Sequence, residues 1–219
     1  MSAPPQAPKI YHIAHVDRLA SMVAAGELWC DATIIQRAPL GTTIGMSSIK
    51  QRRLTLPLDS HPGLKVGQCV PFYFCPRSIM LYLLHKGNHA ELTYKGGQGP
   101  IVHLECDLFE AIKWSELIGR RWAFTLSNAG AYYFEDRANI AALGEINWDA
   151  VSTNQWSGAG VSSSVKEGKQ AEFLVEQCFP WHLVRRIGVL SPAIVQAVSQ
   201  SIPNGAHRPT IEIKRDWYY

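Results

Sequence analysis

The 219-residue chain lacks any run of about 18 consecutive apolar residues, the length that a helix needs to span a bilayer. Its first eight residues also lack the basic start and apolar core of a signal peptide, so we expect a cytoplasmic protein without membrane contact. Charged residues make up only 18% of the chain against 47% hydrophobic residues. This composition excludes a disordered chain, which combines low hydrophobicity with high charge.

The five cysteines are an odd number and lack the spacing of metal ligands. Cys69 and Cys75, with a histidine pair downstream, come nearest to a zinc site, but finger cysteines stand only about two to four residues apart. Cys106 and His103 do not form a catalytic dyad, because residues three apart on a strand point to opposite faces. We expect reduced, mostly buried thiols, a structural His103 and no metal site.

Two common phosphate-binding designs are missing. No Gly-x-Gly-x-x-Gly follows a strand and opens a helix, and no Gly-Lys-Ser or Gly-Lys-Thr loop is present. The net charge of +3 does not by itself indicate a nucleic-acid-binding protein.

Strand and helix patterns alternate irregularly, which favours an α+β fold with largely antiparallel sheets over a parallel βαβ fold. We expect a flexible N-terminus at residues 1–8 and a single domain at residues 9–219. The expected strands are 9–14, 69–75, 100–106, 122–126 and 210–214, and the expected helices are 16–25, ended by Gly26, then 78–84, 107–114 and one that starts at Ser191-Pro192.

Two long segments, Leu40–Gly67 and Asn154–Gly168, show no clear period and are predicted to be loops. Loops of this length are uncommon unless they are functional. The second is rich in Gly and Ser, and Trp156 is its only large apolar side chain. An exposed tryptophan there would be a surface on which a base could stack.

Five segments carry the residues of chemical interest. They are Ile10–His15 (Ile-Tyr-His-Ile-Ala-His), Ile49–Arg53 (Ile-Lys-Gln-Arg-Arg), Val70–Met80 (Val-Pro-Phe-Tyr-Phe-Cys-Pro-Arg-Ser-Ile-Met), Phe124–Ala129 (Phe-Thr-Leu-Ser-Asn-Ala) and Lys169–Val175 (Lys-Gln-Ala-Glu-Phe-Leu-Val). In this order and at these distances, the segments resemble those of the DarT family, bacterial toxins that ADP-ribosylate DNA. The resemblance runs from about Ile10 to Tyr218, and Val-Pro-Phe-Tyr-Phe and Gln-Ala-Glu are its most specific parts.

The resemblance implies an ADP-ribosyltransferase fold, in which two largely antiparallel sheets form an NAD cleft and helices flank them. It implies NAD as co-substrate and transfer of ADP-ribose to a base, typically thymine, in single-stranded DNA. It also implies a cognate macrodomain antitoxin resembling DarG. Two positions depart from the family pattern: Asn128 stands where the family often has His, and Arg18 where it often has Asn.

Glu172 is the expected catalytic carboxylate. Loss of nicotinamide from a ribose passes through a transition state with oxocarbenium character, which a nearby carboxylate stabilises. Glu172 stands between the Gly/Ser-rich segment and an apolar run, and its position matches the family's catalytic Glu. The residues alone leave open a surface Glu on an amphipathic helix.

Arg52 has two expected roles. It can bind the NAD phosphates through paired hydrogen bonds, and it can act on the acceptor base. The resemblance implies that an Arg in this segment helps to deprotonate the base. An Arg is a poor base because its pKa exceeds about 12, so we expect it to stabilise the anionic base instead. Arg53 is the alternative if the register is wrong by one.

The end of the first strand, His12, Ile13, Ala14 and His15, is expected to hold the nicotinamide and its ribose. Which of the two histidines contacts NAD stays open. Tyr73 is a candidate to stack on the nicotinamide ring, and a core tyrosine is an equally good interpretation.

The DNA strand requires phosphate contacts and stacking surfaces. The candidates are Lys50, Arg53, Lys166 and Lys169 as cations, Trp148 and Trp156 as stacking surfaces, and Asn128 as a contact to the target base.

Two alternatives stay open. The same fold could modify RNA or a protein side chain, or the chain could be a nucleic-acid-binding module without NAD chemistry. The presence of Arg52 and Glu172 counts against the second.

Overall fold

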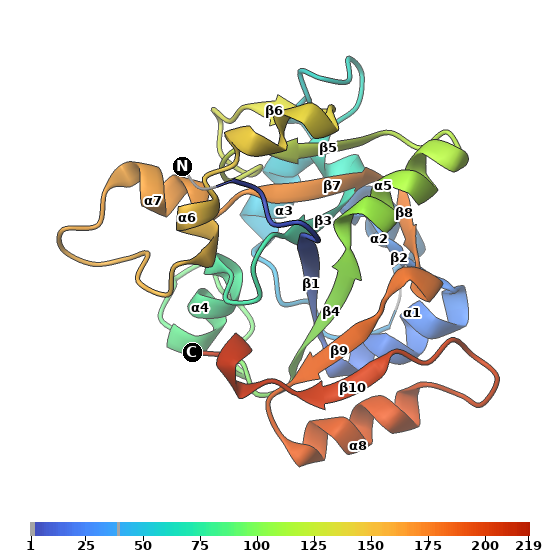
Figure 1. The fold of residues 1–219 in the computed structure, drawn as a ribbon. Coiled ribbons are helices and arrows are strands. Elements are labelled where there is room, and N and C mark those ends of the chain that lie inside the picture. The colour runs from blue at the N-terminus through green and yellow to red at the C-terminus, as the bar shows by residue number, and fades with distance from the viewer. Residues whose placement is uncertain (1–2, 39) are drawn as a thin grey trace.

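The computed structural model describes residues 3–38 and 40–219, so Met1 and Ser2 of the expected flexible N-terminus lie outside the described residues. The strands are β1 Lys9–His15, β2 Glu27–Trp29, β3 Cys69–Tyr73, β4 Ile101–Asp107, β5 Trp122–Thr125, β6 Asp136–Arg137, β7 Glu172–Glu176, β8 Cys178–Pro180, β9 Arg186–Val189 and β10 Thr210–Ile213. Within the described residues they form an eight-stranded sheet in the order β10-β9-β4-β1-β3-β7-β5-β6 and a two-stranded sheet, β2-β8 (Figure 1). The β9–β10 pair is parallel, and the other pairs are antiparallel.

The α-helices are α1 Leu19–Ala25, α2 Asp31–Arg37, α3 Ser47–Arg53, α4 Ile79–Lys86, α5 Leu108–Leu117, α6 Trp148–Ser152, α7 Ser163–Gly168 and α8 Pro192–Ser201. The boundaries expected at Ser78 and Gly26 are observed. The Ser78 side chain accepts a hydrogen bond from the Leu81 amide at the start of α4, and Gly26 ends α1 with a φ of 70°.

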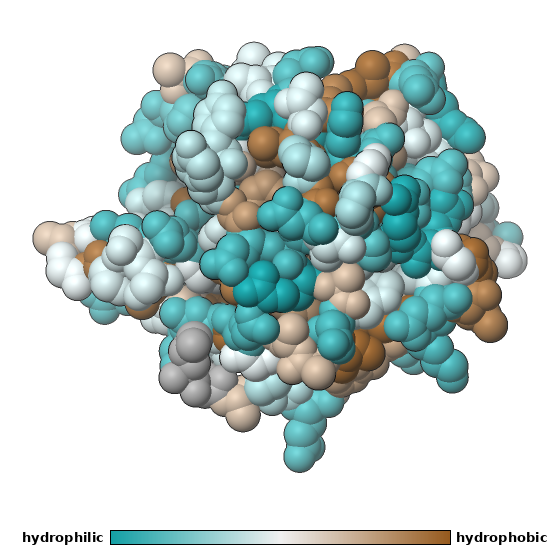
Figure 2. Space-filling view, turned by 90° about the horizontal axis from the view of Figure 1, so that it is seen from above, coloured by the Kyte–Doolittle hydropathy of each residue, from teal (hydrophilic) through white to brown (hydrophobic). Residues whose placement is uncertain are grey.

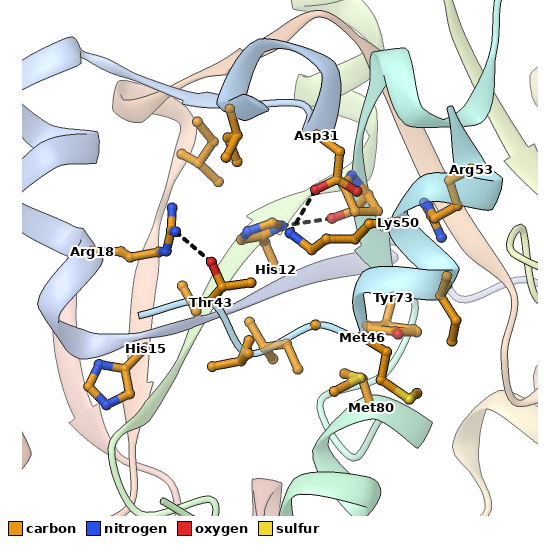
Figure 3. Close-up of a pocket in the computed structure, with 18 of the residues that line it drawn as sticks. His12, His15, Arg18, Asp31, Thr43, Met46, Lys50, Arg53, Tyr73 and Met80 are labelled. Atoms are coloured by element: carbon orange, nitrogen blue, oxygen red, sulfur yellow. Dashed lines mark hydrogen bonds and ion pairs between the residues drawn. The ribbon is translucent and has the colours of Figure 1, made fainter. Parts of the chain in front are cut away.

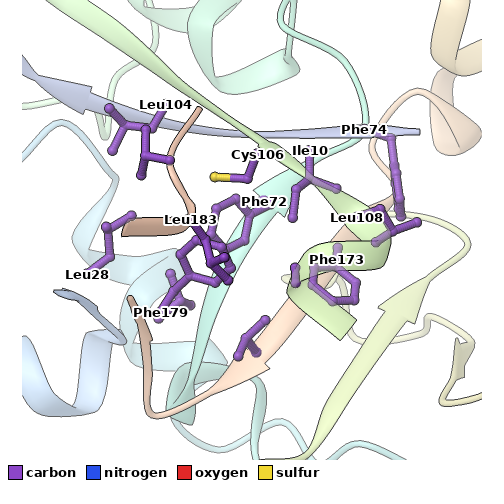
Figure 4. Packing of buried hydrophobic residues seen from close by; sticks show 14 of the residues in the cluster. Ile10, Leu28, Phe72, Phe74, Leu104, Cys106, Leu108, Phe173, Phe179 and Leu183 are labelled. Carbon is purple, nitrogen blue, oxygen red and sulfur yellow. The ribbon is translucent and has the colours of Figure 1, made fainter. Parts of the chain in front are cut away.

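Hydrophobic side chains cover both faces of the large sheet. On one face, Phe72, Phe173 and Phe179 pack together with side chains of α1 and α5 (Figure 4). On the other face, Tyr11 and Ile13 pack against α4 and Trp217. On the surface seen from above, polar side chains cover most of the area and hydrophobic ones form separate small groups (Figure 2). No helix in the described ranges has the length and hydropathy that a membrane crossing requires.

The large sheet opens between β1 and β3. β1 pairs with β4 along its whole length, from Lys9↔Asp107 to His15↔Ile101, but its registered pairing with β3 is limited to Tyr11↔Tyr73. The two strands therefore diverge beyond this pair and leave space beside the end of β1. The expected α+β fold with two largely antiparallel sheets and flanking helices is confirmed, and the opening lies within the larger sheet.

Two segments predicted to be loops contain helices. α3 lies in Leu40–Gly67, and α7 lies in Asn154–Gly168. Each helix has two turns or fewer, too short for an apolar period to show in the sequence. Helices of this length depend on tertiary contacts rather than on propensity.

His103 lies on β4 and is buried, as predicted for a structural histidine. Its ring contacts those of Trp217 and Tyr218, and Nε2 donates a hydrogen bond to the Pro76 carbonyl at 3.0 Å. Burial lowers the pKa of His103 to about 4, although hydrogen bonds to backbone carbonyls oppose the shift.

This lowered pKa of His103 predicts that the folded protein loses stability in acid. The unfolded chain binds a proton at His103 below about pH 6.5, whereas the folded chain does so only near pH 4, so stability is lost as the pH falls between these values. We expect His103 to contribute a loss of about 3 kcal/mol in the free energy of unfolding over this range. Urea unfolding of the wild type and His103→Gln, which keeps a donor for Pro76, measures it. A difference between the two that does not change with pH would contradict the assignment.

Candidate active site

A cavity of about 410 Å³ lies where β1 and β3 diverge (Figure 3). The end of β1, β3, the start of β7, the segment 42–46 and α3 all contribute side chains to its lining. His12, Ile13, Ala14, His15 and Tyr73 line this cavity, so the structure brings together the residues predicted to hold the nicotinamide end of NAD.

A buried ion pair stands at the wall formed by α3 and β7. Arg53 Nη1 lies 3.1 and 3.0 Å from the two carboxylate oxygens of Glu172, and Nη2 lies 3.0 Å from Oε2. The backbone amide of Ala129 donates a further hydrogen bond to Glu172 Oε1 at 3.2 Å. The carboxylate is thus fixed in orientation by partners from two distant segments.

The exposed fractions are 7% for Arg53 and 3% for Glu172, so both charges are nearly removed from water. Burial acts to lower the pKa of Arg53, but the negative charges of Glu172 and then Asp31 outweigh it and raise this pKa. The guanidinium therefore stays charged. Removing two charges from water costs free energy that their mutual attraction only partly returns, so a buried ion pair is weak evidence that the pair stabilises the fold.

His12 is held as a neutral ring. Its Nδ1 lies 2.8 Å from the carbonyl oxygen of Pro71, which can only accept, so Nδ1 carries the proton. Burial lowers the pKa of His12, and the hydrogen bond to Pro71 opposes this only in part. The neutral ring leaves Nε2 as an acceptor. His15 is engaged elsewhere, because its Nδ1 lies 2.9 Å from Asp17 and its ring packs edge-on to Tyr94.

Two further cations line the cavity. Arg18 donates through Nε to the Thr42 carbonyl at 2.8 Å and through Nη2 to Thr43 Oγ1 at 3.0 Å. Lys50, predicted to contact DNA, also lines the cavity and pairs with Asp31 at 2.8 Å (Figure 3). Arg18 was not predicted as a site residue; its only signal was its departure from the family pattern.

The structure places Arg53, not Arg52, beside Glu172. The Arg52 guanidinium points away from the first cavity, and its Cζ lies 5.0 Å from the ring centroid of Tyr132. The two residues are neighbours on α3, where a shift of one residue turns a side chain by about 100°. The place beside Glu172 that was expected for Arg52 is therefore held by Arg53, the alternative if the register is wrong by one, and Arg53 is too buried to contact a DNA phosphate.

Three other predicted DNA contacts are buried. Trp148 packs edge-on to Phe74 and donates from Nε1 to the Leu143 carbonyl. Trp156, expected to be exposed, is 5% exposed and donates to the Tyr219 hydroxyl at 2.9 Å. Lys169 donates from Nζ to the carbonyls of Val151 and Thr153. The expected exposure of Trp156 is thus wrong, and other parts of the chain cover all three side chains. Lys166 is exposed on α7.

Asn128 lines the cavity, as does a residue that the sequence analysis missed. Asn128 Nδ2 donates to Oε1 of Gln170 at 2.9 Å, and Gln170 Nε2 donates to the Lys166 carbonyl. Gln170 belongs to the Gln-Ala-Glu motif, which was the available signal. No group of three or more His, Cys, Asp or Glu side chains within the described residues could hold a metal ion.

The comparisons with known proteins agree with this geometry. The family model described as ssDNA thymidine ADP-ribosyltransferase, DarT, matches residues 11–219. A DNA ADP-ribosyl transferase of a Thermus species (strain 2.9) is 33% identical over 98% of this chain and 98% of its own length. A DNA ADP-ribosyl transferase of Thermus aquaticus is 34% identical over 96% of this chain and 88% of its own length.

Two solved structures are similar along nearly the whole chain. Thermus sp. 2.9 DarT in complex with ADP-ribosylated ssDNA has a TM-score of 0.86 at 32% identity, covering 100% of this chain and 99% of that one. Thermus sp. 2.9 DarT in complex with NAD+ has a TM-score of 0.80 at 31% identity, covering 99% and 100%.

The fold and the site define a DNA ADP-ribosyltransferase, an enzyme that uses NAD. The chain belongs to the DarT family of ssDNA thymidine ADP-ribosyltransferases, which confirms the resemblance inferred from the sequence.

The ion pair predicts unequal roles for the adjacent arginines in stability. Arg53→Ala leaves the Glu172 carboxylate buried without its charged partner, which costs about 3–5 kcal/mol of unfolding free energy. Arg52→Ala loses a contact with an exposed ring and should cost about 1 kcal/mol or less. Urea unfolding of the two matched variants measures the difference, and equal losses would argue against the pair as described.

Proposed function

We propose that this enzyme binds NAD+ in the cavity between β1 and β3 and transfers ADP-ribose to a thymine in single-stranded DNA, with release of nicotinamide. The observation that carries the proposal is the buried Arg53–Glu172 pair, whose carboxylate stands in the cavity wall with its orientation fixed. The proposal is also supported by the similarity of this chain to Thermus sp. 2.9 DarT, whose structures are described in complex with NAD+ and with ADP-ribosylated ssDNA.

In this proposal the NAD pyrophosphate lies near Arg18 and Lys50, which line the cavity besides Arg53. Arg18 is fixed by three acceptors in residues 41–43, which sets the direction of its remaining donors. The nicotinamide end lies beside Ile13 and Ala14, where Nε2 of neutral His12 accepts a hydrogen bond. Tyr73 lies opposite Glu172 in the β3–β7 register, so its ring can pack against the nicotinamide next to the carboxylate.

Glu172 acts on the sugar. As the bond from ribose C1′ to the nicotinamide nitrogen breaks, positive charge develops on the ribose and the carboxylate stabilises it. Three contacts from Arg53 and one from Ala129 hold the carboxylate in place before the reaction, so no reorganisation is needed at that moment.

Arg53 acts on the acceptor. C1′ forms a bond to a ring nitrogen of the base as its bond to the nicotinamide nitrogen breaks, nicotinamide leaves as a neutral molecule, and the proton of the base nitrogen passes to water. A charged guanidinium is unable to accept the proton, but it stabilises the negative charge that develops on the base. Asn128 offers a neutral amide at the same wall, which can hydrogen-bond to the base without titrating.

We also propose two features of the cellular setting. The enzyme acts in the cytoplasm, where single-stranded stretches of bacterial DNA arise. A macrodomain antitoxin resembling DarG reverses the modification, because an enzyme that modifies its host's DNA requires an activity that removes the adduct.

Glu172→Gln tests the catalytic assignment. The amide keeps the size and accepts from Ala129 but carries no negative charge, so we expect the rate of ADP-ribose transfer to a thymine-containing single strand to fall by about 100-fold or more. Mass spectrometry of the oligonucleotide measures the adduct. Glu176→Gln is the matched control on the same strand, because Glu176 pairs with Arg121 outside the cavity, and it should retain transfer.

Two results would contradict the proposal. One is unchanged transfer by Glu172→Gln. The other is a wild-type enzyme that labels only RNA or protein when each is offered with NAD+, or that labels nothing and releases no nicotinamide.

A further inference from the structure

A second cavity, of about 650 Å³, lies next to the first. Leu126, Ser127 and Gly168 line it, whereas Asn128 and Gln170, one and two residues further along the same two segments, line the first. The hydrogen bond from Asn128 to Gln170 joins these segments. The two cavities therefore lie on either side of one pair of side chains.

The second cavity has two exposed aromatic side chains on its wall. Tyr132 is 73% exposed and Tyr133 is 93% exposed, and both line the cavity. Large aromatic side chains are usually at least half buried, so two consecutive exposed ones indicate a binding surface.

The backbone ties this pair to the active site. The Ala129 amide donates to the Glu172 carboxylate, and the Ala131 amide donates to the Asn128 carbonyl. Tyr132 follows Ala129 by three residues, a backbone reach of at most about 11 Å. A strand of DNA with one base at Glu172 can thus place a neighbouring base on these rings.

Arg52 supplies a cation at the same place. Its guanidinium lies over the Tyr132 ring, and its Nε is buried without a hydrogen-bond partner in the part of the chain that the structure describes. Arg52 directly precedes Arg53, which pairs with Glu172, so α3 places one arginine at Glu172 and the next one at Tyr132. A phosphate there would gain a charge-assisted hydrogen bond.

The charges around the second cavity orient a nucleotide. Glu135 and Glu145 both pair with Arg137, and the Asp136 carboxylate accepts from the amides of Asp59 and Ser60. Asp59 and Glu167 add exposed negative charge to the lining. A phosphate is repelled from this lining and attracted to Arg52, which leaves the cavity to the uncharged base.

We propose that the second cavity binds the base next to the target base in single-stranded DNA, with Tyr132 and Tyr133 as stacking surfaces and Arg52 on the phosphate that joins the two nucleotides. This inference rests on the proposed function and assigns the residues that give the enzyme its sequence context. Stacking on aromatic rings has the strength to do so, at about 1–3 kcal/mol per base.

The test measures binding of a fluorescent single-stranded oligonucleotide with one thymine by anisotropy. We expect Tyr132→Ala/Tyr133→Ala to weaken binding about 10-fold or more. Removing only the base beside the thymine, as an abasic site, should weaken binding by the wild type similarly. Combining the two changes should give little further loss, because both remove the same contact.

Three further measurements separate the loss of this site from a general defect. Phe109→Ala removes an aromatic side chain that lines neither cavity and should bind DNA as the wild type does. Arg52→Gln should reduce the dependence of log affinity on log salt by about 0.7, the effect of one phosphate contact on a single strand. NAD+ binding without DNA should be unchanged in the double tyrosine variant.

The inference would be overturned if abasic sites on either side of the thymine left the affinity of the wild type unchanged. It would also be overturned if the loss of affinity from the tyrosine substitutions and the loss from the abasic site multiplied when the two changes were combined. If the wild type still forms the thymine adduct in that case, the proposed function stands and only the second site falls. Absence of any adduct from the wild type would instead overturn the proposed function, and the second site with it.

Discussion

The bidentate contact between Arg53 and Glu172 joins the parts of the molecule on which the site depends. Arg53 comes from a two-turn helix in a segment of irregular structure, Glu172 opens β7, and Ala129 adds its amide from the loop after β5. The local sequence of α3 does not by itself require a helix, and this contact holds α3 together with the Lys50–Asp31 ion pair and the packing of Ile49. The pair is buried, so its charges interact strongly, and the loss of one partner leaves the other without solvation.

The cavity beside this pair follows from the way in which β1 is paired. β1 is bound to β4 along its length but meets β3 in register at one residue pair. The divergence exposes the end of β1, and burial keeps His12 neutral beside it. One wall therefore offers backbone and an uncharged acceptor, and the opposite wall offers a fixed carboxylate. This is the arrangement that a leaving nicotinamide and a developing ribosyl cation require.

The sequence predicted well where a residue's position depends on local pattern. The strand expected at 9–14 is β1, the helix ended by Gly26 is α1, and the helix expected to begin at Ser78 is α4, so these elements follow from period and boundary residues. The family resemblance then supplied the role proposed for Glu172, which the residues alone left open.

The wrong predictions concern side chains whose exposure or direction depends on contacts with residues far away in the sequence. Trp156 looks exposed in a Gly/Ser-rich segment, but Tyr219 covers it from 63 residues away. Lys169 looks like a surface cation, but two carbonyls bind it. Choosing between Arg52 and Arg53 required knowing which side of α3 faces β7, and a helix of seven residues carries too little pattern to show that.

The central claim is that the Arg53–Glu172 pair is retained for chemistry rather than for stability. The free energy of unfolding of Arg53→Met/Glu172→Met, measured in urea beside the wild type, tests it most directly. Replacing a buried ion pair by apolar side chains of similar volume is often neutral or stabilising, so the account predicts a double variant at least as stable as the wild type. A double variant less stable by about 3 kcal/mol or more would show that the fold itself requires the pair, and would contradict the account.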